Sequence, residues 1–191
     1  MFMLYNDLLI FKNIPTLKSQ RLVLRKITQK DVFDVFEYAS DPLVTKYLLW
    51  REHSEIDYTR EYLNNLKRKY KRAEFYDWGI EYEGHMIGTV GFTSLSIASN
   101  TGEIGYVIDE KFWGQGIASE AVREVIRFGF EELLLERIEC RYLKENARSP
   151  RLAERCHMKY EGCLRHAMIV KGEYRDVCIS SILASEYSSI S

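Results

Sequence analysis

A short stretch with little side-chain bulk, FWGQGIASEA (residues 112–121), stands directly before a predicted helix. Gly114 and Gly116 are two residues apart, and Ala118 and Ser119 follow them. The first turn of a helix carries unpaired backbone N–H groups and a partial positive charge, which together attract phosphate. Glycine also suits a loop that needs positive φ. Because several small residues occur together, we interpret the stretch as an anion-binding loop.

Two well-known phosphate-binding patterns fit this stretch poorly. A dinucleotide-binding fold places its glycines directly after its first strand, whereas several predicted strands precede Gly114. Ser119 also stands at the third glycine position, although Glu136 or Glu139 does lie about 20 residues further on, as that fold requires. No Gly-Lys-Ser/Thr follows the glycines, so the P-loop pattern is absent.

The elements around the stretch predict an α+β fold. Polar–apolar alternation predicts about seven strands, and apolar stripes at helical spacing predict about four helices. Their order is strand, two helices, three strands, helix, strand, helix and two strands. We therefore expect a mixed, mostly antiparallel sheet in which a helical crossover makes at least one pair parallel. The predicted strands are 21–27, 75–82, 85–95, 103–109, 137–143, 161–170 and 174–184, and the predicted helices are 28–40, 54–73, 119–133 and 149–157.

Length and composition predict one globular domain over residues 1–191. Apolar residues make up 46% and charged residues 29%, and the formal net charge of −1 gives no reason to expect nucleic acid or an anionic membrane as a partner. Four cysteines without metal-ligand spacing indicate reduced thiols, no metal site and a cytoplasmic protein. The apolar N-terminus lacks the basic start of a signal peptide, and we expect a strand or an arm there.

Nearly the whole chain resembles the GNAT superfamily of acyl-CoA-dependent N-acetyltransferases. The resemblance runs from IPTLKSQRLVLRKITQKDV to YRDVCISSIL, and EIGYVIDEKFWGQGIASEA is its most specific part. The pattern N-x-x-S at residues 146–149 supports it. The closer match is the branch that acetylates the N-termini of ribosomal proteins, in which dimers are familiar.

The resemblance implies a cofactor site built around acetyl-CoA. The glycine loop would bind the pyrophosphate of coenzyme A, and the strand at 103–109 would splay from the strand at 137–143 and pair with the pantetheine arm. Asn146 would hold that arm from the other side. The implied cofactor-binding residues are Val107, Ile108, Gly114, Gln115, Gly116, Ile117, Ala118, Ser119, Asn146 and Ser149.

Two residues are candidate catalytic groups for moving acetyl from the thioester to an amine. Glu103 opens the strand beside the expected cleft and is the candidate base, directly or through water. Ser149 is the candidate proton or hydrogen-bond donor to the departing thiolate, although a serine there also suits a helix cap. Tyr106 and Tyr142 are further candidate donors. Met168 stands where some members of the family carry a Glu, so that base is absent.

Three functions of different classes stay open at this point. The first is an acetyltransferase acting on a protein N-terminus, or on a small amine such as a polyamine or an aminoglycoside. Trp50, Tyr76 and Trp78 are candidates for its acceptor cleft, and core packing explains them equally well. The second is an acyl-CoA-binding module without catalysis, which the missing Glu at position 168 would suit. The third is a nucleotide-binding module that uses the glycine loop.

Overall fold

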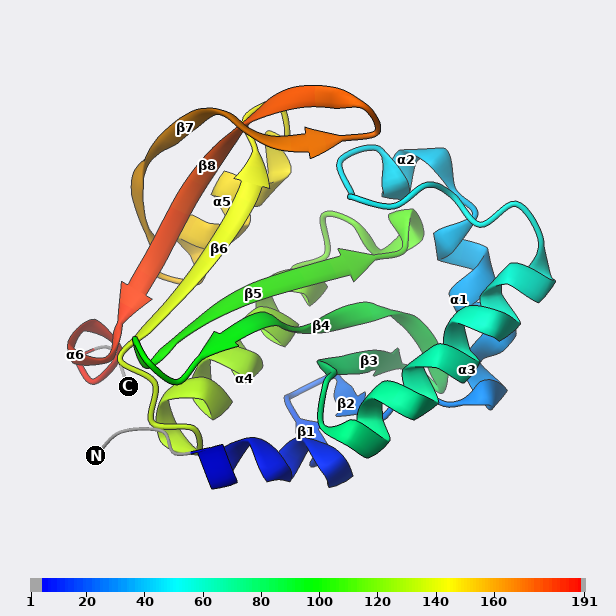
Figure 1. Cartoon of the computed structure of the whole chain (residues 1–191), viewed down its shortest axis with the longest axis horizontal. Coiled ribbons are helices and arrows are strands. Elements are labelled where there is room, and N and C mark those ends of the chain that lie inside the picture. Colours follow the sequence, from blue (N-terminus) through cyan, green and yellow to red (C-terminus); the bar gives the residue numbers. More distant parts are fainter. Residues whose placement is uncertain (1–4, 190–191) are drawn as a thin grey trace.

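The computed structural model describes residues 5–189, and its centre is one mixed sheet (Figure 1). Within the described residues the sheet has eight strands in the order β1-β2-β3-β4-β5-β6-β8-β7. All neighbouring strands are antiparallel except β5 and β6. The strands are β1 (Leu17–Lys18), β2 (Val23–Arg25), β3 (Tyr76–Tyr82), β4 (His85–Ser96), β5 (Thr101–Ile108), β6 (Arg137–Leu143), β7 (Lys159–Val170) and β8 (Glu173–Leu183).

Helices cover both faces of this sheet, with α4 behind it and α3 in front of it in Figure 1. Phe128 of α4 packs edge-on against Trp78 of β3, with ring centroids 5.3 Å apart. On the other face, the Tyr70 hydroxyl of α3 donates to the Asp77 carbonyl of β3 at 2.8 Å. The α-helices are α1 (Val32–Ala39), α2 (Pro42–Thr45), α3 (Ile56–Arg72), α4 (Ile117–Glu131), α5 (Arg148–Arg155) and α6 (Ala184–Tyr187), and the 3-10 helices are η1 (Tyr5–Asn13), η2 (Gln29–Asp31) and η3 (Glu110–Phe112).

The expected splay lies between β5 and β6. The two strands pair only from Thr101 to Glu103, opposite residues 137–139. Beyond Glu103, β5 stays paired with β4 and β6 stays paired with β8, so the two strands diverge (Figure 1). Their facing backbone groups therefore have no strand partner across the gap.

Most differences from the predicted elements concern short pieces. The strand β1 and the helices α2 and α6 have two to four residues. Elements this short do not show a recognisable pattern of apolar residues in the sequence. Of the two alternatives for the N-terminal segment, a strand or an arm, the strand was wrong, because residues 5–13 form η1; residues 1–4 of that segment lie outside the described part. Within residues 5–189, none of the helices has the length and apolarity that crossing a membrane requires.

Candidate active site

Two residues of the glycine loop before α4 adopt a backbone conformation that favours glycine. Gly114 and Gly116 have φ of 78° and 77°, in the left-handed region. A Cβ at Gly114 would meet nothing within 4 Å, and one at Gly116 would meet only the Arg21 guanidinium, at 3.7 Å. Positive φ therefore explains these two glycines within the protein. The space beside them is open to a ligand.

The backbone N–H groups of residues 114–119 form a cluster of free donors. Ile117 begins α4, and the first main-chain bond of that helix is donated by Glu120 to Gly116 at 3.0 Å. Within the described residues, no protein acceptor is bonded to the N–H groups of residues 114–119. Such a cluster at a helix N-terminus suits a diphosphate.

Trp113 leaves this cluster accessible. Its indole Nε1 donates to the Ile108 carbonyl at 2.9 Å, and the Arg148 guanidinium stacks on its ring at 3.9 Å from the centroid. Gln115 points elsewhere, because its side-chain Nε2 donates to the Lys111 carbonyl at 3.0 Å.

A cavity of about 770 Å³ connects the glycine loop to the gap in the sheet and to the helices α1 to α3 beyond it. Its wall brings together all of the sequence-predicted site residues except Gln115. The predicted residues that line it are Glu103, Val107, Ile108, Gly114, Gly116, Ile117, Ala118, Ser119, Asn146 and Ser149.

Ser149 lies in a hydrogen-bonded group beside the gap. Its hydroxyl accepts from Asn146 Nδ2 at 2.9 Å and shares a hydrogen bond of 3.0 Å with the Tyr106 hydroxyl. Burial raises the pKa of Tyr106 to about 12, so the phenol keeps its proton at neutral pH. The helix-cap interpretation of Ser149 was wrong, because Ala147 occupies the N-cap of α5 and Ser149 is the second residue of the helix.

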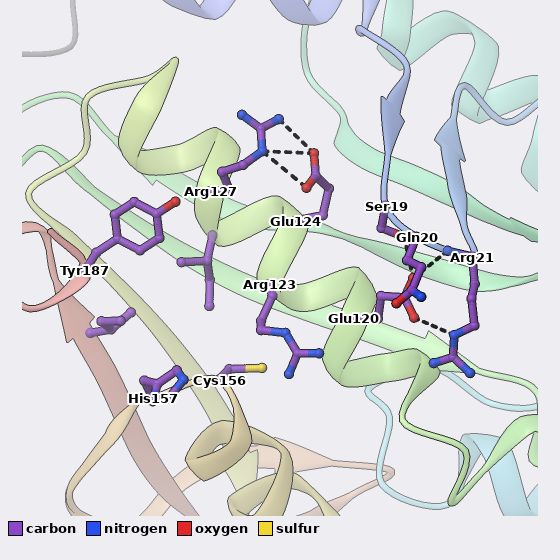
Figure 2. A pocket seen from close by; sticks show the side chains of 12 residues that line it. Ser19, Gln20, Arg21, Glu120, Arg123, Glu124, Arg127, Cys156, His157 and Tyr187 are labelled. Atoms are coloured by element: carbon purple, nitrogen blue, oxygen red, sulfur yellow. Dashed lines mark hydrogen bonds and ion pairs between the residues drawn. The ribbon is translucent and has the colours of Figure 1, made fainter. Parts of the chain in front are cut away.

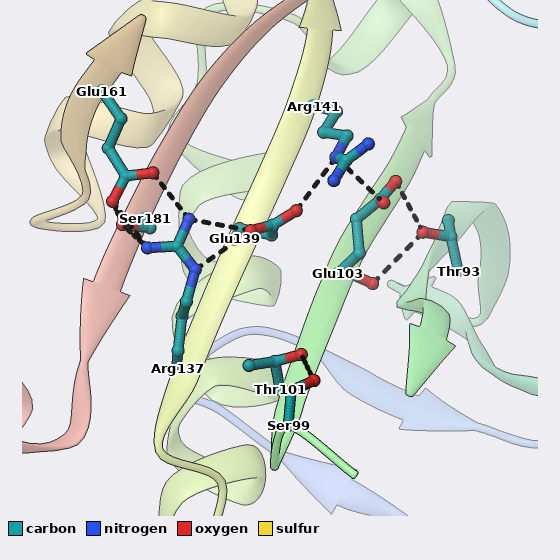
Figure 3. Close-up of polar contacts among 9 residues, drawn as sticks. All are labelled: Thr93, Ser99, Thr101, Glu103, Arg137, Glu139, Arg141, Glu161 and Ser181. Atoms are coloured by element: carbon teal, nitrogen blue, oxygen red, sulfur yellow. Dashed lines mark hydrogen bonds and ion pairs between the residues drawn. The ribbon is translucent and has the colours of Figure 1, made fainter. Parts of the chain in front are cut away.

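Glu103 lies at the point where β5 and β6 separate (Figure 3). Its carboxylate accepts from the Thr93 hydroxyl at 3.0 Å, and its Oε2 lies 3.5 Å from Arg141 Nε. Arg141 also binds Glu139, at 2.9 Å. The carboxylate of Glu103 is thus at the cavity, but neighbouring side chains already occupy it.

The two candidate catalytic groups reach the cavity from opposite faces of the sheet. Successive side chains of a strand alternate between faces, so Tyr106 of β5 points to the face opposite that of Glu103. Ser149 joins Tyr106 on the side of α4 and α5. The gap therefore places hydroxyl donors on one side and carboxylates on the other, which suits a reaction in which one group gives a proton and another accepts one.

The far end of the cavity is mostly apolar and aromatic. Of the tryptophans and tyrosine proposed for an acceptor cleft, Trp50 lines it, whereas Trp78 is fully buried in the core and Tyr76 packs on Phe11. Met168 lines it too, so an apolar side chain replaces the expected Glu. Sequence reasoning missed Asp77 of β3 and a group from α1 to α3: Val35, Tyr38, Leu43, Val44, Tyr47, Leu48, Leu49, His53, Tyr58 and Tyr62.

His53 is a structural member of that group. Its Nδ1 lies 2.8 Å from the Thr59 hydroxyl, and its ring contacts the rings of Trp50, Tyr58 and Tyr62. Burial lowers its pKa, so the imidazole is neutral at pH 7.

Comparison with known proteins gives the same assignment along most of the chain. Residues 21–159 match the family described as Acetyltransferase (GNAT) domain. The uncharacterized N-acetyltransferase p20 of Bacillus licheniformis is 35% identical over 178 residues, which cover 92% of this chain and 99% of the relative. The ribosomal-protein-serine acetyltransferase of Escherichia coli is 34% identical over 95 residues, covering 50% of this chain and 53% of the relative.

Solved structures share the fold. A GNAT-family acetyltransferase from Bacillus anthracis superimposes with a TM-score of 0.79 at 30% identity, covering 90% of this chain and 100% of that one. RimL, a ribosomal α-N-protein acetyltransferase solved in complex with coenzyme A, superimposes with a TM-score of 0.77 at 23% identity, covering 88% and 98%. With the free N–H cluster and the gap in the sheet, these matches show that the chain belongs to the GNAT family of acetyl-CoA-dependent N-acetyltransferases.

Proposed function

We propose that the chain acetylates the α-amino group at the N-terminus of a protein. The observation that carries this proposal is the free N–H cluster of residues 114–119, which borders a cavity that also reaches Glu103 and the aromatic side chains around Trp50. Acetyl-CoA supplies a thioester whose carbonyl carbon forms a bond to nitrogen as its bond to sulfur breaks. The similarity to a ribosomal-protein-serine acetyltransferase supports a protein terminus as the acceptor.

Each part of the site has a role in this proposal. The N–H groups at the start of α4 hold the diphosphate, and the unpaired edge of β5 around Val107 holds the pantetheine arm. Asn146 holds the arm from the other side. Ser149 and Tyr106 give a hydrogen bond or a proton to the departing sulfur, since both hydroxyls lie on the side of α4 and α5.

An α-amine suits a site without a strong base. Its pKa is near 8, compared with about 10.4 for a lysine side chain, so a larger fraction is neutral at pH 7. The four cysteines are free thiols, which supports a cytoplasmic location, and one continuous sheet supports a single domain.

Acetyl transfer to defined amines tests the proposal. Purified protein with acetyl-CoA is given peptides that begin with Ser, Ala or Met, the same peptides blocked by N-acetylation, a polyamine and an aminoglycoside. We expect thiol release and a mass increase of one acetyl group on the unblocked peptides, and neither on the blocked ones. Turnover confined to the polyamine or the aminoglycoside would assign a small-molecule acceptor. Binding of acetyl-CoA without turnover on any amine would favour the alternative that the protein binds acyl-CoA without catalysing a reaction.

A further inference from the structure

One carboxylate in the cavity wall lacks a protein partner. Asp77 lies on β3 and lines the cavity. Its Oδ1 atom is buried and accepts no hydrogen bond. Within residues 5–189, its carboxylate also forms no ion pair. A buried charge without a partner is costly, so its persistence in a cavity wall indicates a ligand that supplies the missing partner.

Two glycines direct this carboxylate toward the gap in the sheet. Asp77 pairs with Gly91 of β4, and Gly91 pairs with Gly105 of β5, so the three residues form one row across the sheet. A Cβ on Gly91 would come within 2.3 Å of Asp77 Oδ1, which shows that the carboxylate lies over the bare backbone of Gly91. Neighbouring strands are about 4.8 Å apart, so the Cα atoms of Asp77 and Gly105 are about 10 Å apart.

The row of Asp77, Gly91 and Gly105 ends beside the gap, where the acetyl group of bound acetyl-CoA would lie in the proposed function. Gly105 is two residues beyond Glu103, the last residue of β5 that pairs with β6. Gly105 has no side chain, but the Thr93 methyl of β4 lies over it, 2.6 Å from where a Cβ on Gly105 would be. An amine beside the Thr93 methyl would lie between the carboxylate and the gap.

The groups around Asp77 favour proton exchange near neutral pH. Burial raises the pKa of Asp77 to about 7, and Lys69 of α3 opposes that rise. The phenols close enough to interact electrostatically with Asp77 belong to Tyr38 of α1 and to Tyr62 and Tyr70 of α3, and burial raises the pKa of all three. These phenols stay neutral at pH 7, so they provide no charge to neutralise the carboxylate.

Glu103 is less suited than Asp77 to receive an ammonium group. Its carboxylate is bonded to Thr93 and lies within 3.5 Å of Arg141, whose positive charge would oppose a second cation. Trp50, Tyr58 and Tyr62 line the cavity on the side of Asp77, and aromatic faces attract cations.

We propose that Asp77 binds the ammonium group of the acceptor and takes up its proton before acyl transfer. The step breaks one N–H bond and forms one O–H bond, and the ammonium and the carboxylate both become neutral. The acceptor that this site selects is a primary amine that binds as a single cation with an apolar group beside it. The inference rests on the proposed acetyltransferase function and adds the residue that recognises the amine.

The variant Asp77→Asn tests the inference, because it keeps the shape and removes the charge. We expect kcat/KM for an unblocked peptide to fall at least 100-fold at pH 7, with the Kd for acetyl-CoA unchanged. The remaining rate should rise with pH up to the pKa of the amine, since asparagine cannot take the proton. Glu83→Gln, in the exposed turn after β3, is the control and should match the wild type. An Asp77→Asn rate within threefold of the wild type would overturn the inference.

A binding measurement separates this inference from the proposed function. Protein saturated with coenzyme A is titrated calorimetrically with phenethylamine and with its uncharged analogue 2-phenylethanol. We expect Asp77→Asn to weaken phenethylamine binding at least tenfold and to leave 2-phenylethanol unchanged. No phenethylamine binding to the wild type, or equal binding to both proteins, would overturn the inference whatever the turnover. The variant should melt at least as high as the wild type, because it removes an unpaired buried charge.

Discussion

The Ser149 hydroxyl can give its proton to Tyr106 or to a ligand, but not to the Asn146 amide nitrogen. Asn146 Nδ2 is a donor, so its hydrogen bond takes one lone pair of the Ser149 oxygen. The Ser149 hydroxyl can therefore donate its proton to the Tyr106 oxygen or to a ligand. The Tyr106 hydroxyl can likewise donate to the Ser149 oxygen or to a ligand. Both hydroxyls line the cavity, so either can donate to a sulfur beside β5.

At the scale of these residues, we expect Ser149→Ala and Tyr106→Phe each to lower kcat by about tenfold. The double variant should be only slightly slower than the slower single variant, because the two hydroxyls supply one proton. Steady-state kinetics with an unblocked peptide measure this. Tyr142→Phe removes the remaining candidate donor and is the comparison: Tyr142 lines the cavity, but its hydroxyl bonds to Ser180 at 3.0 Å, so we expect a smaller loss. Multiplicative losses would show two independent roles.

At the scale of elements, the first turn of α4 is fastened to the turn between β1 and β2. Glu120 accepts from the Ser19 hydroxyl at 2.7 Å and from Arg21 Nε at 2.7 Å (Figure 2). The same guanidinium donates to the Gln115 carbonyl at 3.2 Å, which holds the glycine loop by its oxygen. Burial alone would raise the pKa of Glu120, but these bonds outweigh it and lower the pKa, so the contact is charged at neutral pH. These contacts hold the glycine loop and the first turn of α4 in place from the protein side.

The substitution Gly116→Ala should weaken coenzyme A binding. An L-residue at positive φ costs about 1–2 kcal/mol. If the loop relaxes to avoid this cost, its N–H groups turn away from the phosphates, and we expect Kd to rise about 5- to 30-fold. Gly84→Ala is the control, because its φ is 84° and a Cβ there would also meet nothing within 4 Å. Calorimetric titration with coenzyme A should find Gly84→Ala unchanged, and equal weakening in both variants would assign the effect to general strain.

Period and spacing predicted the long elements well, and the reason is physical. The strand predicted at 137–143 has those bounds in the structure. One face of β6 is buried, so polar and apolar residues alternate along its sequence. The glycine loop could be predicted because its small residues are neighbours in the sequence and stand directly before a predicted helix. Asp77 has no such signal. Its importance depends on Gly91 and Gly105, which lie beside it only after β3, β4 and β5 pair.

At the scale of the whole molecule, the gap in the sheet weakens the attachment of β6, β8 and β7 to the rest. Only three residues of β5 pair with β6. Side chains reinforce this end of the sheet (Figure 3). Arg137 of β6 binds Glu139 at 2.8 Å, Glu161 of β7 at 2.5 Å and the Ser181 hydroxyl of β8 at 2.9 Å. One guanidinium therefore joins three strands at the end where they meet β5.

This network should make stability depend on pH in the acid range. The Arg137 hydrogen bonds, together with one from Ser181, lower the pKa of Glu161 from 4.5 to about 2. A depressed pKa means that the contribution is complete above pH 4.5, where the carboxylate is ionised in both states. It is lost as the pH falls from 4.5 toward 2, because the unfolded chain then binds the proton more readily than the folded one.

We therefore expect Glu161→Gln to lower the free energy of unfolding by about 1 kcal/mol at pH 7, a modest value because the pair is partly exposed. The difference from the wild type should shrink as the pH approaches 2.5, and urea unfolding at pH 7, 4 and 2.5 measures it. Glu132→Gln is the control, since that exposed side chain forms no hydrogen bond or ion pair within the described residues. A Glu161→Gln difference that stays constant with pH would mean that the variant acts through packing rather than through charge.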